Sequence, residues 1–346
     1  MTTSDESKDT MRGLLGLENL GNTCYMNAVL QAWRNCPEWT LFCKTNRIDD
    51  HLKDKDTSCA KFVYAYKDLV QTLWAGSGPA YVKPLGFYDQ LKQIVKGTLY
   101  EDFVRRTPQD AHEFLVWMLD QMYMATQKEV DIQIKNESHL SPMILSAVKG
   151  WKQAFEKQYS PLTDLIFGLY RIQYKCHGCK TVHTRWETFN ILKVSLARDS
   201  DGSPLPLLQC IEKELVPEEI EEYACDACKQ KCTTTKTVSI WRLPKVLIVT
   251  LKRFTPMGTK DNAPLKYDGT PLNLTTVFSP ESFEESKQKH YNCFATVDHH
   301  GHHMGGHYTA QALSPVWHKW HLYDDESVHP IQQPTYGHST YILMFR

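Results

Sequence analysis

The chain has 346 residues, of which 42% are hydrophobic, and its 39 Lys and Arg residues balance 40 Asp and Glu residues. A chain of this length can bury a large core, either as one elaborate domain or as two ordinary ones. The balanced charge disfavours nucleic acid and anionic membranes as partners, because both attract an excess of basic residues.

The amino terminus, MTTSDESKDT, is polar and acidic, so residues 1–12 are expected to form a flexible tail. It lacks the order of a signal peptide, and no apolar run reaches membrane-spanning length, so we expect an intracellular protein of the cytoplasm, the nucleus or both. The eleven cysteines are odd in number and include two C-x-x-C pairs. Such a pattern in a long chain favours metal and thiol chemistry over disulfides.

The stretch ENLGNTCYMNAVLQAW places Cys24 between a turn and an amphipathic segment. Apolar residues recur there at helical spacing: Met26, Val29, Leu30 and Trp33. The spacing predicts a helix that is stopped by Pro37, with Cys24 in its first turn. The positive end of the helix dipole would favour the thiolate of Cys24, the nucleophilic form of cysteine. The alternative is a buried, inert thiol, so a catalytic role requires a partner base elsewhere.

A second helix is predicted in TPQDAHEFLVWMLDQMY. Thr107 is the expected N-cap, Pro108 suits the first helical position, and Asp110 completes a capping-box pattern. The expected buried face consists of Ala111, Phe114, Leu115, Met118 and Met122. Residues 128–160 are polar and are expected to form helix and loop.

The later part of the chain has the pattern of strands. LPKVLIVTLKRF, residues 243–254, is a β-branched run typical of a strand buried on both faces. Further strands are expected in YNCFATVDHH, HYTAQAL, WHKWHLY and TYILMF, separated by Gly, Ser and Pro. Helices followed by an antiparallel sheet predict an α+β fold.

A candidate base comes from His307, which follows two glycines and opens the strand HYTAQAL. If this strand and the next form a hairpin that turns at Pro315 and Val316, His307 lies directly opposite Asp324. An imidazole beside a carboxylate is the base and orienting group of a nucleophilic triad. Because Pro-Val is not a preferred tight turn, the register is open, and Asp325 is the fallback partner.

The histidines before this strand have a second interpretation. His299, His300, His302 and His303 could bind a transition metal, but no carboxylate or cysteine stands at a ligand spacing. A polar loop is the simpler interpretation.

Cysteines also form a quartet in the middle of the chain. CHGC supplies Cys176 and Cys179, and CDAC supplies Cys225 and Cys228. Two such turns can hold one structural Zn²⁺ in a tetrahedron of thiolates, with no coordination position left for substrate. Cys232 lies nearby and could substitute or be idle. The alternatives are two redox pairs or unrelated buried thiols.

The ordered set GLENLGNTCYMNAVLQAW, QDAHEFL, the two C-x-x-C pairs, LPKVLIVTLKRF, GGHYTA, YDDESV and TYILMFR resembles the ubiquitin-specific protease family over residues 14–346. The resemblance implies one papain-like catalytic domain over residues 13–346. Its parts would be a helical thumb (about 13–165), zinc-ribbon fingers (about 166–240) and an antiparallel β palm (about 241–346).

The resemblance also implies residue roles. Cys24 would be the nucleophile, His307 the general base and Asp324 its partner, with Asp325 as an auxiliary carboxylate. Asn19 matches the side-chain donor to the oxyanion, which would act together with the backbone N–H of Cys24.

The family cleaves after the Gly-Gly end of the extended ubiquitin tail. Gly305 and Gly306 would form part of the wall of a narrow channel, and Asp110 and Glu113 match positions that hold tail arginines. Asp110 could instead simply cap its helix, and Glu113 could be solvated. The histidine-rich loop and the proline in TPQDA depart from the family pattern.

The expected reaction is hydrolysis of a peptide or isopeptide bond at the carboxyl terminus of ubiquitin, through a Cys24 thioester and without an organic cofactor. The expected partners are ubiquitin and ubiquitinated proteins, with no nucleic acid and no membrane, and the chain is expected to be a monomer. A ubiquitin-binding protein without activity, an enzyme for another ubiquitin-like modifier and a zinc-ribbon protein that binds nucleic acid are the rival interpretations.

Overall fold

The structure is a computed structural model, and it describes residues 13–52, 54–75, 80–255, 258–279, 281–282, 290–302 and 305–346. The tail expected at residues 1–12 lies outside the described residues. The chain divides into two compact units, which are described separately. The first comprises the chain up to Gln127, Thr250–Pro264 and Cys293–Phe345, and the second comprises Lys128–Val249, Leu265–Asn292 and Arg346.

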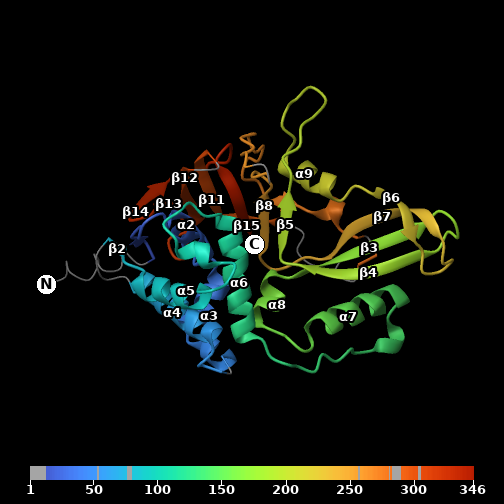
Figure 1. Cartoon of the computed structure of the whole chain (residues 1–346), viewed down its shortest axis with the longest axis horizontal. Coiled ribbons are helices and arrows are strands. Elements are labelled where there is room, and N and C mark those ends of the chain that lie inside the picture. Colours follow the sequence, from blue (N-terminus) through green and yellow to red (C-terminus); the bar gives the residue numbers. More distant parts are fainter. Residues whose placement is uncertain are drawn as a thin grey trace. The chain divides into compact units, whose positions relative to one another are not determined.

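The first unit combines helices from the amino-terminal part with strands from the carboxyl-terminal part (Figure 1). Its helices are α2 (Cys24–Trp33), α3 (Pro37–Lys44), η1 (Arg47–His51), α4 (Ser58–Leu73), α5 (Leu85–Val95), η2 (Glu101–Val104) and α6 (Ala111–Thr126). Its strands are β1 (Gly16–Leu17), β2 (Tyr81–Val82), β11 (Cys293–His302), β12 (Gly305–Leu313), β13 (Trp320–Asp324), β14 (Ser327–Ile331) and β15 (Thr340–Phe345).

Helix α2 begins at Cys24 and ends at Trp33, as its spacing predicts. Every position after Cys24 is buried, because α2 packs against β12 and β11 as well as against α6. Pro37 follows α2 and begins the next helix, α3. It occupies the first turn of α3, where its missing N–H costs nothing.

Helix α6 starts later than the sequence predicts. The expected N-cap Thr107 and the expected first position Pro108 both precede the helix, and Asp110 is the N-cap. The Asp110 Oδ1 atom accepts hydrogen bonds from the backbone N–H groups of His112 at 2.7 Å and Glu113 at 3.0 Å. Thr and Asp are both favoured N-cap residues, and here the Asp110 carboxylate is the group that accepts from the free N–H groups of the first turn. The predicted apolar face is buried throughout.

The strands β14, β13, β12, β11 and β15 follow one another in that order as antiparallel neighbours. The predicted β12–β13 register is wrong, because it would place Ala310 opposite His321. The structure pairs Ala310 with Tyr323 and Ala312 with His321. The connection is longer than the expected Pro315–Val316 turn, and Ser314 N donates to Lys319 O across it at 3.0 Å.

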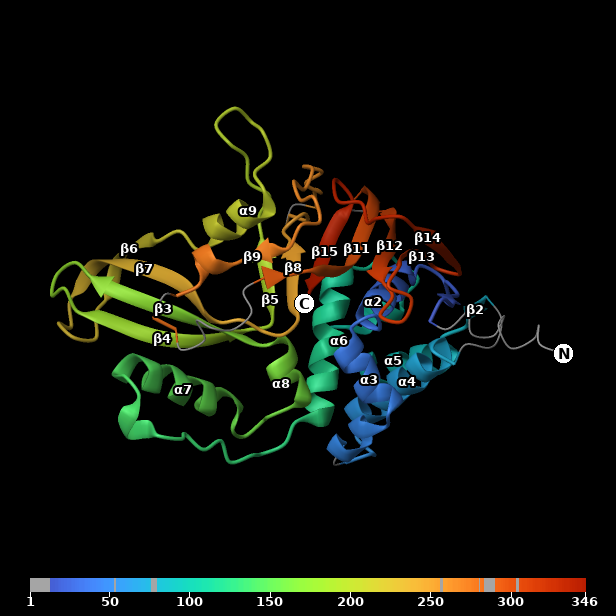
Figure 2. The ribbon, with the colours of Figure 1, turned by 180° about the vertical axis from the view of Figure 1, so that it is seen from behind.

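The second unit contains a four-stranded antiparallel sheet, in the order β4 (Val182–Phe189), β3 (Gly168–Cys176), β7 (Lys231–Arg242) and β6 (Glu218–Ala224). Helix α7 (Pro142–Phe155) packs against β4, as both views of the ribbon show (Figures 1 and 2). Trp241, Leu169 and Ala147 form a small core there. The helices are η3 (Glu137–His139), α7 (Pro142–Phe155), α8 (Pro161–Ile166), α9 (Leu207–Glu214) and η4 (Thr275–Val277).

The remaining strands complete the inventory. They are β5 (Ile191–Val194), β8 (Leu247–Leu251), β9 (Leu272–Asn273) and β10 (His290–Tyr291). Strand β8 is buried at every position, Thr250 included, as its run of β-branched residues predicts. Among the described residues, the helices fall short of the length and apolarity needed to cross a bilayer.

Candidate active site

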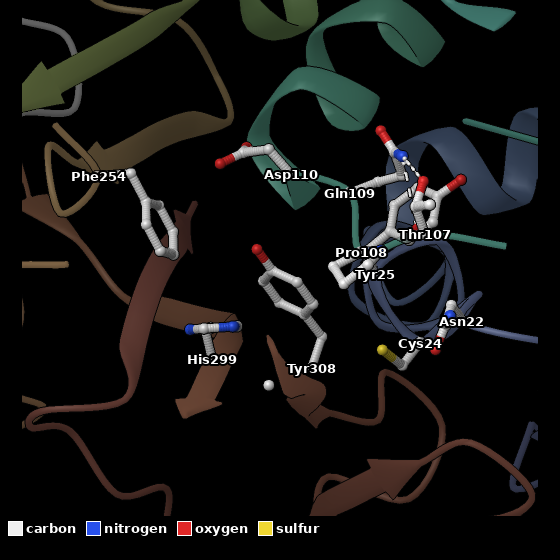
Figure 3. A pocket seen from close by; sticks show the side chains of 11 residues that line it. Asn22, Cys24, Tyr25, Thr107, Pro108, Gln109, Asp110, Phe254, His299 and Tyr308 are labelled. Atoms are coloured by element: carbon white, nitrogen blue, oxygen red, sulfur yellow. Dashed lines mark hydrogen bonds between the residues drawn. The ribbon is translucent and has the colours of Figure 1, made fainter. Parts of the chain in front are cut away.

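Cys24 lies at the first position of α2, at the edge of a cavity of about 310 Å³ in the first unit. The cavity is lined by Asn22, Cys24, Tyr25, Thr107, Pro108, Gln109, Asp110, Phe254, His299, Gly306 and Tyr308. Figure 3 shows the hydroxyl group of Tyr308 pointing towards Asp110. The lining therefore combines the start of α2, the segment before α6, and strands β11 and β12.

The electrostatic surroundings of the Cys24 sulfur act in two directions. Burial, the largest effect, raises the pKa of the thiol, and the Asp325 carboxylate raises it further. Hydrogen bonds from the backbone N–H groups of Tyr308, Tyr25 and Cys24 itself lower it, and the last two lie at the start of α2. The start of α2 therefore favours the thiolate, as expected, but burial outweighs this effect and the net shift of the pKa is upward. Ionisation of Cys24 requires a base nearby.

His307 and Asp324 are joined side chain to side chain. The His307 Nε2 and Asp324 Oδ1 atoms lie 2.5 Å apart, and both side chains are partly exposed. The observed strand register differs from the predicted one by two residues, and a shift of two keeps every side chain on the same face of the sheet. His307 therefore reaches Asp324 diagonally rather than directly. The bond to Nε2 leaves Nδ1 as the nitrogen that can serve a nucleophile.

His307 lies between two residues that line the cavity, Gly306 and Tyr308. Tyr308 follows His307 in β12, and its backbone N–H interacts with the Cys24 sulfur. In addition, a ring nitrogen of His307 and one carboxylate oxygen each of Asp324 and Asp325 all lie within 4.8 Å of one another. The three polar groups and Cys24 thus gather where the start of α2 meets β12 and the β13–β14 turn.

Asp325 connects two asparagines from the amino-terminal part of the chain. Its Oδ2 atom accepts a hydrogen bond from Asn19 Nδ2 at 2.8 Å, and its Oδ1 atom accepts one from Asn27 Nδ2 at 2.8 Å. Asn27 lies one turn after Cys24 in α2 and is buried. Burial raises the pKa of Asp325, whereas the bonds from Asn27 and Asn19 lower it. Asp325 thereby fixes the side chain of Asn19 relative to the helix that carries Cys24.

Backbone contacts hold the same region together. Leu17 N donates to Asp325 O at 2.8 Å, and Asn19 N donates to Glu326 Oε1 at 2.9 Å. A Cβ atom at Gly16 would lie 2.1 Å from the carbonyl oxygen of Glu326, so only glycine permits this close approach. The β13–β14 turn is thus held against the segment that leads into α2.

Asp110 has its carboxylate engaged within the protein. Besides capping α6, it accepts hydrogen bonds from the Tyr341 hydroxyl at 2.8 Å to Oδ2 and 3.0 Å to Oδ1. The same carboxylate lines the cavity. Glu113, one turn later, is exposed on the surface of α6. Asp110 therefore lines the same cavity as Cys24, and the role of both carboxylates in binding the ubiquitin tail stays a prediction.

The two glycines before His307 differ in their surroundings. A Cβ atom at Gly306 would lie 2.4 Å from His299 Nε2 and 2.4 Å from the carbonyl oxygen of His300, whereas a Cβ atom at Gly305 would meet nothing within 4 Å. Gly306 lines the cavity and lets the His299 ring approach the backbone of β12. The expectation of a polar loop is wrong for His299, His300 and His302, which lie in strand β11, and His303 lies outside the described residues.

The cysteine quartet forms a cluster in the second unit. The sulfur atoms of Cys176, Cys179, Cys225 and Cys228 all lie within 4.8 Å of one another, and those of Cys179 and Cys225 are 3.7 Å apart. Zn–S bonds of about 2.3 Å at tetrahedral angles separate neighbouring sulfurs by about 3.8 Å. The donor set and its spacing therefore fit a tetrahedral zinc ion. All eleven cysteines are free thiols.

Three residues that hold the site in place are not predicted from the sequence. Asn27, Glu326 and Tyr341 hold Asp325, Asn19 and Asp110, respectively. The signal for Asn27 is a polar residue on a helix whose other faces are apolar, and such a buried amide requires partners. Glu326 and Tyr341 carry no comparable signal, because their partners are more than two hundred residues away in sequence.

Comparisons with known proteins identify the family of the chain. The family model described as ubiquitin carboxyl-terminal hydrolase matches residues 15–345. Ubiquitin carboxyl-terminal hydrolase 2 of Bos taurus is 30% identical over 353 residues, covering 99% of this chain and 57% of that protein. The protein with the same description from Homo sapiens is 30% identical, with 96% of this chain and 55% of that protein covered. The chain thus spans little more than half of these relatives.

A solved structure has the same fold. The SAGA Ubp8/Sgf11/Sus1/Sgf73 DUB module bound to ubiquitin aldehyde includes a chain that matches all of this one with a TM-score of 0.71. The sequences are 22% identical, and 71% of that chain is covered. The α+β fold expected from the sequence is therefore confirmed. Because the family model covers nearly the whole sequence, the chain belongs to the ubiquitin carboxyl-terminal hydrolase family.

Proposed function

We propose that this chain is a cysteine-type deubiquitinase, which hydrolyses the peptide or isopeptide bond at the carboxyl-terminal glycine of ubiquitin through a thioester on Cys24. The observation that carries the proposal is the hydrogen bond between His307 and Asp324. His307 directly precedes Tyr308, whose backbone N–H contacts the Cys24 sulfur. Membership of the family and the ubiquitin aldehyde bound to the structural relative support the choice of substrate.

The nucleophile needs His307, since its surroundings raise the thiol pKa. In the proposed reaction His307 takes the proton of Cys24, and the sulfur attacks the carbonyl carbon of the terminal glycine. The C–N bond then breaks, and His307 gives its proton to the departing amine. In the second half, His307 removes a proton from water and the hydroxide attacks the thioester. The C–S bond then breaks, His307 returns its proton to the Cys24 sulfur, and free ubiquitin leaves with a new carboxylate. Asp324 holds the imidazole in the required tautomer and stabilises its charged form.

The oxyanion of each tetrahedral intermediate would be bound by the backbone N–H of Cys24 and the side-chain amide of Asn19. The Asn19 Nδ2 atom carries two hydrogens, and Asp325 accepts one of them. The second hydrogen can serve the oxyanion. Asn19 Oδ1 accepts hydrogen bonds from Gly21 N at 3.0 Å and Thr23 N at 3.2 Å, which orients the amide. One such donor typically stabilises the transition state by about 3 kcal/mol.

The cavity beside Cys24 would receive the tail of ubiquitin. Gly306 keeps one wall of this cavity free of a side chain, which suits a substrate that ends in two glycines. Asp110 presents a carboxylate there, and Glu113 lies one turn along α6. We assign these two carboxylates to arginines of the tail, because guanidinium groups pair with carboxylates through two hydrogen bonds.

The four clustered cysteines would hold one structural zinc ion, which supplies a crosslink between two turns of the second unit. The residues that would bind it are Cys176, Cys179, Cys225 and Cys228. The catalytic steps use only side chains of the first unit and require no organic cofactor. The division into thumb, zinc-ribbon fingers and palm is part of the same proposal.

The partners that follow are ubiquitin and ubiquitinated proteins, acted on by a monomer. The near-neutral net charge of −1 supports the exclusion of nucleic acid. A free nucleophilic thiol and a set of zinc-binding thiols persist in a reducing compartment, which supports the cytoplasm or nucleus as the location.

The test is turnover of ubiquitin that carries a fluorescent amine at its carboxyl terminus, beside the same reporter built on other ubiquitin-like modifiers. Wild-type protein should release the fluorophore from ubiquitin, whereas Cys24→Ala and His307→Ala should be inactive. Binding of ubiquitin without turnover would favour a non-catalytic ubiquitin-binding protein. Turnover of another modifier alone would reassign the substrate.

A further inference from the structure

A fifth thiol lies between the two cysteine turns of the second unit. The first turn, Cys176–Cys179, follows strand β3, and the second, Cys225–Cys228, lies between β6 and β7. Strand β7 is flanked by β3 on one side and β6 on the other, and Cys232 is its second residue. Cys232 therefore comes from the strand that lies between the two turns.

The register of the sheet places Cys232 against the first turn. Cys176 pairs with Thr234, and His177 N donates to Thr233 O at 2.9 Å. If the pairing of β3 with β7 is continued for two residues past Cys176, Gly178 lies opposite Cys232. A Cβ atom at Gly178 would lie 2.7 Å from the Cys232 sulfur and 3.6 Å from the Cys176 sulfur. The Cys232 thiol thus fills the space that a side chain at position 178 would need.

The other edge of β7 brings Cys232 near the second turn. Cys232 pairs with Tyr223, which lies two residues before Cys225. The Cys176 and Cys228 side chains, one from each turn, both act on the pKa of the Cys232 thiol. Cys179, by comparison, has its contacts with Thr181 at 3.3 Å and Cys225 at 3.7 Å. Cys232 is accordingly a neighbour of one ligand from each turn.

We propose that Cys232 is a reserve zinc ligand that replaces Cys228 when the Cys228 thiolate is lost. The proposal rests on the zinc site of the proposed function. Of the two ligands next to Cys232, Cys228 is the one to be replaced because it is partly exposed, whereas Cys176 is only 2% exposed. In the exchange, a Zn–S bond to Cys232 forms in place of the bond to residue 228, and the Cys232 proton passes to solvent. Four sulfurs again surround the ion.

The test compares four proteins purified without chelator: wild type, Cys228→Ser, the double variant Cys228→Ser with Cys232→Ser, and the control Cys228→Ser with Cys59→Ser. Cys59 is a partly exposed thiol of the first unit, where its sulfur donates to Gln121 Oε1. We expect one zinc per chain in wild type, in Cys228→Ser and in the control, and less than a tenth of that in the double variant.

Cobalt substitution and alkylation give readouts that are independent of activity. The visible spectrum of the cobalt form should indicate four thiolates in Cys228→Ser, as in wild type. Iodoacetamide should modify Cys232 in the zinc-loaded wild type and leave Cys232 unmodified in zinc-loaded Cys228→Ser. Loss of zinc from Cys228→Ser, retention of zinc by the double variant, or alkylation of Cys232 in Cys228→Ser would overturn the proposal. A wild-type protein without zinc would instead overturn the zinc site itself.

Discussion

The side-chain amide of Asn19 donates a hydrogen bond of 2.8 Å to the carboxylate of Asp325, which lies 306 positions later in the sequence. The second oxygen of the same carboxylate accepts from Asn27, in the helix that starts at Cys24. Asp325 is therefore committed to holding two amides. It thereby positions the candidate oxyanion donor.

Replacing Asp325 with asparagine should lower kcat by about 10²-fold, within the range for losing one oxyanion donor. Asparagine keeps the shape and tolerates the positive φ of 45° at this position, but it can accept from only one of the two amides. We expect KM to change little. Steady-state kinetics with the ubiquitin reporter and thermal unfolding measure the effect. A kcat within twofold of wild type, in a folded variant, would contradict the positioning role.

The two glycines before His307 offer a matched pair of substitutions. Gly306→Ala should raise KM at least tenfold, because its Cβ would lie 2.4 Å from the His299 ring in the cavity wall. Gly305→Ala should behave as wild type, since a Cβ there meets nothing within 4 Å. The readouts are KM and kcat with the ubiquitin reporter. Equal effects of the two substitutions would show that the cavity wall at Gly306 does not receive the substrate.

Asp110 has two proposed roles, which two substitutions separate. Asp110→Ala removes the N-cap of α6 and should destabilise the protein by about 1 kcal/mol. Asp110→Asn keeps a capping oxygen but loses the charge that an arginine requires, so it should raise KM several-fold with little change in stability. Urea unfolding and KM measurements distinguish the two. An unchanged KM in Asp110→Asn would leave Asp110 with the capping role alone.

Asp298 provides a prediction about pH. It is buried, and its Oδ2 atom accepts from Thr296 Oγ1 at 2.7 Å and Gln311 Nε2 at 2.9 Å, yet burial raises its pKa. The folded protein therefore binds the Asp298 proton more tightly than the unfolded chain does. The stability from this proton is complete below the unfolded pKa of about 4 and is lost as pH rises through the folded pKa.

Asp298→Asn removes this dependence, because its amide is neutral at every pH. The melting temperature of the variant relative to wild type should rise as pH increases from about 4. Melting curves at a series of pH values measure the difference. A difference that stays constant, or that shrinks as pH rises, would show that the buried carboxyl group does not control this part of the stability.

The sequence predicts those parts of the site that depend on local pattern. Helical spacing after Cys24 predicts α2 because an apolar period survives without tertiary information. The C-x-x-C spacing predicts the cysteine cluster because each turn brings its own two sulfurs together. The contact between His307 and Asp324 is predicted from a wrong register, and it is found because a slip of two residues preserves the face of a strand.

Other parts depend on contacts that local pattern does not contain. The start of α6 has several polar residues that can cap a helix, and the choice of Asp110 is supported by the hydroxyl of Tyr341, far away in the chain. The pKa of Cys24 depends on how deeply α2 is buried, which the dipole argument ignores. In both cases the missing information is tertiary.

The central claim is that Cys24 is the nucleophile that His307 activates towards the end of ubiquitin. Its most direct test is covalent capture by ubiquitin that carries a thiol-reactive group at its carboxyl terminus, with the modified residue located by mass spectrometry. Wild-type protein should form one adduct, on Cys24, and Cys59→Ala should form the same adduct. His307→Ala should react at least 10²-fold more slowly near neutral pH, within the usual contribution of a general base. An adduct on another cysteine, or capture by Cys24→Ala at the wild-type rate, would contradict the account.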